Sequence, residues 1–261
     1  MQTLPHNTAR FFHLWLYKLH FRFKMKGYLT FFLLLVFVQL SPAQNHQKIK
    51  HFFGKSYPGV VQYLEQHKPT LKKHLPTHPP EAAFILAMGF PELLRYNTLQ
   101  NRLETAFLEA LYVKKGPTYA NFSVGRFQMK PSFAESLEQY CQKYLKFTGV
   151  KIYRYEVVGI NNIRKARVKR LNNLGWQLKY LHSLYLALNH RFAHKKFTSR
   201  AQKLRFFAAA YNFGFLNTAT KIQQWSQNKA FPYGKNYIGK QQNYTDIALD
   251  FYLNEALKFF K

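Results

Sequence analysis

The stretch Tyr119–Phe133 reads YANFSVGRFQMKPSF and combines glycine, glutamine, aromatic residues and proline. It follows neither the 3.6-residue period of a helix nor the alternation of a strand, so it predicts a binding loop. Gly125 lets a ligand approach the backbone closely, and Gln128 both donates and accepts hydrogen bonds. Phe127 and Phe133 offer apolar faces. A cleft that binds sugars needs groups of these kinds.

A second segment, residues 208–214, reads AAAYNFG and follows this loop along the chain. GRFQMKPSF resembles the Gly-Leu-Met-Gln-x-x-Pro loop of the lysozyme-like lytic transglycosylases, with Phe127 in place of methionine and Gln128 retained. AAAYNFG resembles the Ala-Ala-Tyr-Asn-Ala-Gly element of the same superfamily, in the same order. The resemblance covers about residues 81–133 and 199–216 and implies a mainly helical, lysozyme-like domain.

The same resemblance implies a site in which one glutamate, at the end of a buried helix, serves first as acid and then as base. The matching position is Glu92, although Leu93 follows it where the family usually has serine. Its 36-residue distance from Gln128 is also longer than the family pattern, so Glu104 remains the alternative acid. The matching substrate-binding positions are Ser123, Gly125, Phe127, Gln128, Met129, Tyr211 and Asn212.

The residues before Glu92 support its role independently of the resemblance. The run Glu81–Phe90 is apolar almost all round, which is typical of a helix buried on every side. Pro80 suits the first turn of this helix, and Pro91 is expected to kink or end it. Burial and the negative end of a helix both disfavour a charged carboxylate, and a general acid needs its proton near neutral pH.

Each candidate also has a purely structural interpretation. A glutamate at a helix end is usually a solvated charge, and Tyr211 with Asn212 can simply end a helix with an aromatic ring in the core. The two matching segments favour the site, in which a Tyr hydroxyl and an amide orient the substrate and the proton. His190 and His194 are spaced four residues apart but have neither an HExxH motif nor a third ligand, so no metal site is expected. No cofactor is needed.

The chain has 39 lysine and arginine residues against 11 carboxylates, a formal net charge of +28, so its partner is expected to carry negative groups. Peptidoglycan strands are the expected partner, and an anionic surface of the cell envelope is a second candidate. The basic run Arg164–Arg170 would suit phosphates of nucleic acid or lipid, but export argues against nucleic acid. Cys141 is the single cysteine, which excludes an intrachain disulfide and is typical of a small buried residue.

Residues 1–43 are expected to be a secretory signal peptide, with an alternative translation start at Met25. The apolar run Tyr28–Leu40 is too short to span a bilayer, and Ser41-Pro42-Ala43 follows it as a cleavage region. Cleavage would remove five basic residues and no acid, leaving 34 basic residues against 11 carboxylates and a formal charge of +23. The protein is therefore expected to be secreted to the periplasm or cell envelope.

The rest of the chain predicts helices, with one exception. Residues 44–80 form a helical extension and residues 81–261 the lysozyme-like domain, with helices at 99–113, 134–145, 163–191, 199–211 and 244–260. The alternation in Gly149–Gly159 predicts a strand or a small β-hairpin. The expected function is cleavage of the bond between N-acetylmuramic acid and N-acetylglucosamine to give anhydromuramyl ends. The alternatives are a lysozyme-type hydrolase and a non-catalytic basic protein that binds peptidoglycan, nucleic acid or membrane.

Overall fold

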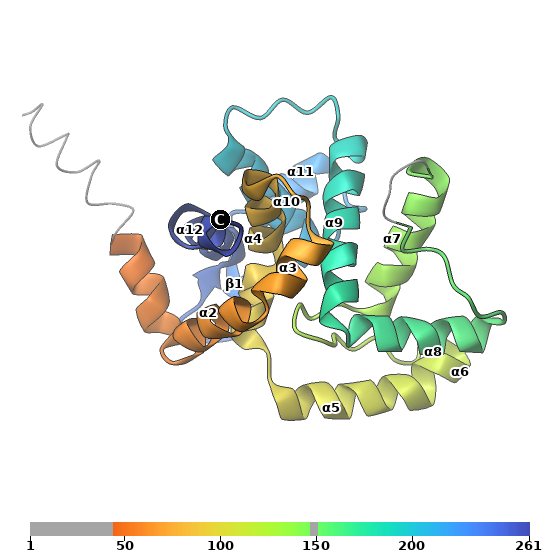
Figure 1. Ribbon diagram of the computed structural model, residues 1–261. Helices are drawn as coiled ribbons and strands as arrows, with labels where there is room; N and C mark the ends of the chain where they lie inside the picture. The colour runs from red at the N-terminus through yellow and green to blue at the C-terminus, as the bar shows by residue number, and fades with distance from the viewer. Residues whose placement is uncertain (1–43, 147–150) are drawn as a thin grey trace, which may run out of the picture. The chain divides into compact units, whose positions relative to one another are not determined.

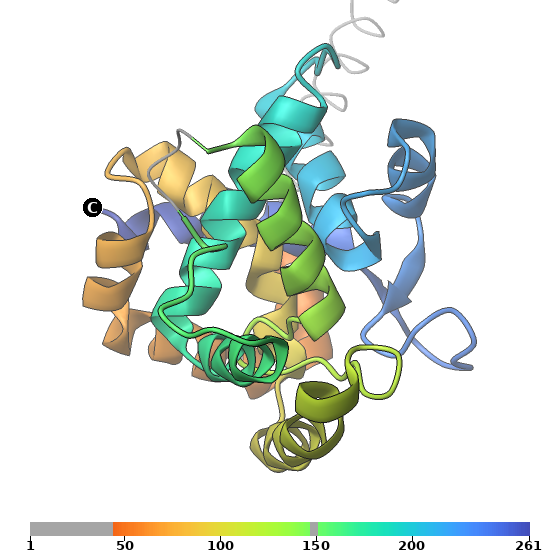
Figure 2. The same cartoon turned by 90° about the vertical axis from the view of Figure 1, so that its right-hand side faces the viewer.

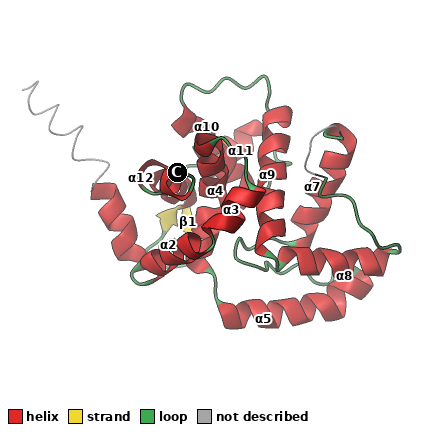
Figure 3. Cartoon of the chain, viewed as in Figure 1, coloured by secondary structure: helices red, strands yellow, loops and turns green. Residues whose placement is uncertain are grey.

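The structure, a computed structural model, describes residues 44–146 and 151–261. The expected signal peptide, residues 1–43, lies outside the described residues. Residues 49–261 belong to one compact unit, whose described part is mainly helical with a small two-stranded antiparallel sheet (Figures 1 and 3). The expected mainly α fold class is therefore confirmed. Within the described ranges, no helix combines the length and apolarity needed to cross a membrane.

Helix α4 (Pro79–Arg95) is the centre of this unit. Pro79 and Pro80 occupy its first turn, where their missing N–H groups cost nothing. Every residue from 82 to 94 is buried, because helices α2 (Ser56–Gln66), α9 (Leu174–Arg191), α10 (Arg200–Phe213) and α12 (Tyr244–Asn254) pack around α4. The all-round burial agrees with the all-round apolar sequence.

The segment before α4 contributes to the same core. Helix α2 packs against α4, and α3 (Lys68–His74) packs against α9. Leu64 and Leu71 are fully buried in these contacts. From residue 49 onward, the expected helical extension is thus part of the compact unit.

Helices α5 (Thr98–Phe107), η1 (Leu108–Tyr112) and α6 (Val113–Lys115) form one continuous helical rod, with a π-helical turn at η1. This confirms the helix expected at 99–113. Helix α5 has no buried residue of its own. Its Asn101 and Thr105 side chains each donate to Asn172 Oδ1 at 3.2 Å, and these bonds join α5 to the turn after α8.

Helix α7 (Pro131–Tyr144) follows the binding loop and lies beside α9 (Figure 2). Helix α8 (Ile160–Leu171) packs against η1 and α6. After α10, the chain forms α11 (Ala219–Trp225), strand β1 (Lys229–Phe231), strand β2 (Gln242–Asn243), α12 and the 3₁₀ turn η2 (Ala256–Phe259). Strands β1 and β2 pair antiparallel and hold the intervening loop 232–241 between them.

Of the two outcomes expected at Pro91, a kink or an end of the helix, the structure excludes the end, because Pro91 lies inside α4. The helix continues for one more turn to Arg95, so Glu92 lies inside its last turn. Proline cannot donate the backbone hydrogen bond of this turn, and α10 and α12 pack against α4.

Two further expectations are corrected. The long helix expected at 163–191 is two helices, α8 and α9, which are separated at Asn172 and Asn173. The Asn173 side chain accepts a hydrogen bond from the backbone N–H of Trp176 at 3.1 Å, so it caps α9 and starts a new helix. The strand or hairpin expected at 149–159 is absent from the described residues 151–159, which form turns and bends. The final helix ends at Asn254, followed by η2.

Candidate functional site

Two neighbouring cavities open where the binding loop approaches the C-terminal end of α4. The first cavity has a volume of about 440 Å³ and the second about 910 Å³. Both are lined by the same four side chains, which we call the junction: Arg95, Ser123, Gln128 and Lys130. Glu92 lines the first cavity and Glu104 the second. A ligand that passes the junction can therefore contact both cavities.

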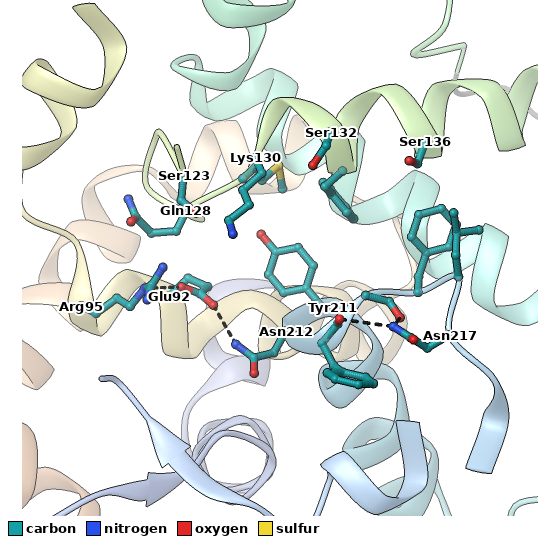
Figure 4. A pocket seen from close by; sticks show the side chains of 16 residues that line it. Glu92, Arg95, Ser123, Gln128, Lys130, Ser132, Ser136, Tyr211, Asn212 and Asn217 are labelled. Atoms are coloured by element: carbon teal, nitrogen blue, oxygen red, sulfur yellow. Dashed lines mark hydrogen bonds and ion pairs between the residues drawn. The ribbon is translucent and has the colours of Figure 1, made fainter. Parts of the chain in front are cut away.

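Glu92 is the buried acid of the first cavity, with only 5% of its surface exposed. Its Oε2 lies 2.6 Å from Arg95 Nε, and its Oε1 accepts a hydrogen bond from Asn212 Nδ2 at 3.4 Å (Figure 4). Burial raises the pKa of Glu92, although the charge of Arg95, the hydrogen bonds from Asn212 and Arg95, and the nearby Tyr244 hydroxyl act to lower it. The carboxyl group therefore keeps its proton to a higher pH than an exposed glutamate.

The end of α10 brings Tyr211 and Asn212 to the same cavity as Glu92. Asn212 contacts the acid directly through its Nδ2. The Tyr211 hydroxyl, in contrast, donates to the backbone carbonyl of Phe127 at 2.5 Å. It therefore holds the binding loop in place and does not orient the proton of the acid. Tyr244, which was not selected from the sequence, lies close to Glu92, and its hydroxyl donates to the Met88 carbonyl at 3.3 Å.

The binding loop is a tight turn closed by backbone hydrogen bonds. Val124 and Met129 each donate to the other's carbonyl at 3.0 Å. Gln128 has φ +51° and is the non-glycine residue with positive φ in the described ranges. Its side-chain amide donates to the Gly125 carbonyl at 2.9 Å. Such a backbone conformation is costly for a side chain larger than glycine and is often retained at functional sites.

Gly125 and Phe127 face the protein interior, which corrects their expected role in ligand contact. Phe127 is fully buried. A Cβ atom on Gly125 would lie 2.1 Å from the Leu171 carbonyl oxygen and 2.2 Å from Gln177 Nε2, and φ is +74°. The glycine is therefore needed for close packing of the loop against α8 and α9. A loop pattern alone does not tell which of its apolar groups face the core.

Other predicted residues have clearer places in the site. Met129 is buried but forms part of the first cavity wall, and Ser123 lines both cavities. Glu104 is half-buried on α5, where its Oε1 accepts from Gln100 Nε2 at 2.8 Å. Phe133 lines the first cavity. The structure thus brings Glu92, Ser123, Gln128, Met129, Tyr211 and Asn212 to one cavity, with Glu104 in the next.

The side chains of Gln177 and Arg126 hold the loop in place, although neither was selected from the sequence. Gln177 on α9 is buried, and its amide accepts from the Phe127 N–H at 3.4 Å and donates to the Val124 carbonyl at 3.2 Å. Arg126 lies between the rings of Tyr63 and Tyr96, with its guanidinium 4.2 Å from each ring centroid. These contacts hold the loop from two sides.

The second cavity carries the groups that proteins use to contact sugars: flat aromatic faces and planar amides. Its aromatic lining comes from Phe52, Phe53, Tyr96, Phe122, Tyr233 and Tyr237. Its amides are Asn97, Gln100, Asn121 and Gln128. The loop 232–241 and the C-terminal end of the helical segment 44–53 contribute to this wall, although neither was selected from the sequence.

In the described ranges, no group of three or more His, Cys, Asp and Glu side chains is suited to a metal ion. His190 Nδ1 and the Tyr140 hydroxyl lie 2.7 Å apart and share a hydrogen bond. No protein-family model matches the chain, and searches of curated proteins and of solved structures find no match either. The function is therefore inferred from the site itself.

Proposed function

We propose that the protein is a peptidoglycan lytic transglycosylase of the cell envelope, secreted to the periplasm or to the cell surface. The proposal is carried by one observation: a buried glutamate, Glu92, borders a cavity between the two segments that resemble this superfamily. Its raised pKa suits a group that must hold a proton before giving it to a leaving oxygen.

In the proposed reaction, Glu92 first protonates the glycosidic oxygen between N-acetylmuramic acid and N-acetylglucosamine, and the C–O bond breaks. The resulting carboxylate then takes the proton of the muramyl hydroxymethyl group, whose oxygen bonds to the anomeric carbon. The proton released in the second step restores the acid, so no water is consumed. The neutral amides of Gln128 and Asn212 orient the sugar without supplying a second carboxylate.

The second cavity supports a polymeric substrate. Its aromatic and amide lining continues from the junction, so a glycan can extend beyond the sugar whose bond is cut. Aromatic faces pack on sugar rings, and planar amides donate and accept hydrogen bonds with their hydroxyls.

The test is mass spectrometry of muropeptides released from purified cell-wall sacculi. We expect chain ends that are lighter by one water than reducing ends, because the anhydro product forms without hydrolysis. Products with reducing ends alone would replace the transglycosylase assignment with a hydrolase. Sedimentation with sacculi without any release would favour a binding protein.

A hydrolase is the second candidate, because Glu104 lines the second cavity, which adjoins the cavity lined by Glu92. A two-carboxylate hydrolase places its acids about 5 Å apart when it retains configuration and about 6.5–9.5 Å apart when it inverts. If Glu104 served as the second carboxylate, Glu104→Gln would abolish water-dependent cleavage. If Glu92 acts alone, the same substitution weakens turnover only slightly.

A further inference from the structure

We propose that the junction is a carboxylate-binding site, in which Arg95 and Lys130 bind an acidic group of the glycan substrate. This rests on the proposed function. The muramyl sugar carries a lactyl carboxyl group, free where the stem peptide has been removed, and stem peptides carry further carboxylates. The ligand class is thus a carboxylate held on the glycan itself.

The charges of the first cavity are unbalanced. Its lining contains two cations, Arg95 and Lys130, and one carboxylate, Glu92. Lys130 is exposed, its ammonium group makes no hydrogen bond or ion pair within the described part of the chain, and its side chain points toward the Glu92–Arg95 pair (Figure 4). When Glu92 is protonated, both positive charges lack a counterion, which favours a bound anion.

The geometry of Arg95 suits two anionic partners. Its Nε contacts Glu92, while its Nη groups have no partner within the described ranges. A guanidinium presents its N–H donors as a fork that matches a carboxylate. The Arg95 side chain is 34% exposed, so these donors are accessible from the cavities, beside the Ser123 hydroxyl and the Lys130 ammonium.

A carboxylate bound at the junction changes the protonation equilibrium of Glu92. The titratable groups that face Glu92 are Arg95 on its own helix, Tyr211 on α10, Tyr244 on α12 and Lys130 across the cavity. Burial raises the pKa of both tyrosines, which keeps them neutral. Arg95 is therefore the cation whose charge favours the ionised form of Glu92, and Lys130 lies in the lining of the same cavity. A substrate carboxylate that pairs with Arg95 weakens its hold on the ionised form of Glu92 and favours the protonated, reactive form.

The test compares two substrates that differ only in charge: glycan strands with free lactyl carboxyl groups and the same strands with those groups converted to amides. The rate of anhydro-end formation is measured for each with one enzyme preparation, so partial unfolding cancels in the ratio. We expect the wild-type protein to prefer the charged strands at least about tenfold, because hydrogen bonds to charged groups are strong.

Arg95→Gln and Lys130→Gln should each reduce this ratio toward one. Lys143→Gln, which removes the same charge from the exposed face of α7, should leave the ratio unchanged. In the wild type, the fall in kcat at high pH should occur at a higher pH for the charged strands than for the amidated strands. Arg95→Gln should abolish this separation, which a merely structural arginine would not affect.

A wild-type ratio of one, or an unchanged ratio in both variants, would overturn the carboxylate site and leave the transglycosylase proposal intact. Failure to cleave either substrate would instead overturn the proposed function. In that case, the affinities of the charged and the amidated strands, measured by calorimetry, test the carboxylate site independently of cleavage. Tighter binding of the charged strands, lost in Lys130→Gln, supports the site, and equal affinities contradict it.

Discussion

Glu92 and Glu138 are buried to the same degree, with 5% of each residue exposed, and both pair with an arginine. Glu138 lies on α7 and has a saturated set of donors. Arg167 Nη2 donates to its Oε2 at 2.6 Å, Tyr155 donates to its Oε1 at 2.6 Å, and the hydroxyl of Tyr180 donates to Oε1 as well. Glu92 has one close cation, a weaker contact with Asn212 and an open cavity beside it.

This difference indicates that Glu138 stabilises the fold, whereas Glu92 is available for a reaction. Hydrogen bonds around Glu138 join α7, α8 and α9, and Arg167 extends the network to the Tyr112 hydroxyl of η1 at 2.5 Å. Nothing in that network can accept a substrate without breaking it. Glu92 has fewer hydrogen-bond donors from the protein around it than Glu138 has, which leaves its proton available to a ligand in the cavity.

The largest effect should come from Glu138→Ala, which leaves the Arg167 guanidinium buried without its main counterion. We expect a loss of about 3–5 kcal/mol in the free energy of unfolding, as measured by urea denaturation. Glu109→Ala on the exposed side of η1 is the control and should stay within about 0.5 kcal/mol of wild type. Equal effects of the two substitutions would show that the network does not stabilise the fold.

Glu92→Gln should do the opposite, keeping the fold and lowering the rate of anhydro-end formation by about a hundredfold or more, the usual contribution of general acid catalysis. The rate is measured on sacculi, and circular dichroism checks the fold. Glu104→Gln, measured in parallel, should lose less. If the two variants rank the other way, the acid is Glu104.

Gly89→Ala connects the core to the site and should have an intermediate effect. A Cβ atom there would lie 2.9 Å from Phe127 Cδ1 and 3.2 Å from the Leu181 methyl groups, so the loop that carries Gln128 must shift. We expect about a tenfold loss in cleavage rate, with overpacking of about 1–3 kcal/mol partly offset by the helix propensity of alanine. Gly59→Ala, where nothing lies within 4 Å, should keep full activity.

The smallest effect is the pH dependence of stability. The folded-state pKa of Glu92 is raised above 4.5, so its contribution to stability is complete below the unfolded-state pKa and is lost as pH rises through the folded-state pKa. Wild-type stability should therefore fall relative to Glu92→Gln as pH rises from about 4.3 upward. Urea denaturation of both proteins over this range measures the difference. A constant difference would mean that burial does not perturb this carboxyl group.

Much of the site could be predicted from the sequence, because motif spacing and apolar periodicity reflect which residues a helix end brings together. Glu92, Gln128 and Asn212 were selected and lie at one cavity. Arg95 was missed, although its position three residues after Glu92 places both on one helix face. Lys130 and the aromatic wall of the second cavity carry no local pattern, since they meet only in the folded unit.

The errors have physical causes as well. The apolar period continues through Asn172 and Asn173, so it predicted one helix where a side-chain cap starts another. Alternation in 149–159 predicted a strand or a small hairpin, but the described residues 151–159 have no neighbouring strand with which to pair. Phe127 was assigned to the ligand because an aromatic residue in a loop gives no sign of the side it faces.

The indole of Trp225 donates to Asn212 Oδ1 at 2.9 Å, and the other end of the same amide contacts Glu92. An indole nitrogen can only donate, so it fixes which end of the amide faces the acid. This single bond makes Trp225 an optical reporter. Its emission depends on the hydrogen bond that it donates, and that bond is two contacts from the carboxyl group. With Trp176→Phe as background and the predicted signal peptide removed, Trp225 is the remaining tryptophan, and ligand entry at Glu92 becomes readable as a change of fluorescence.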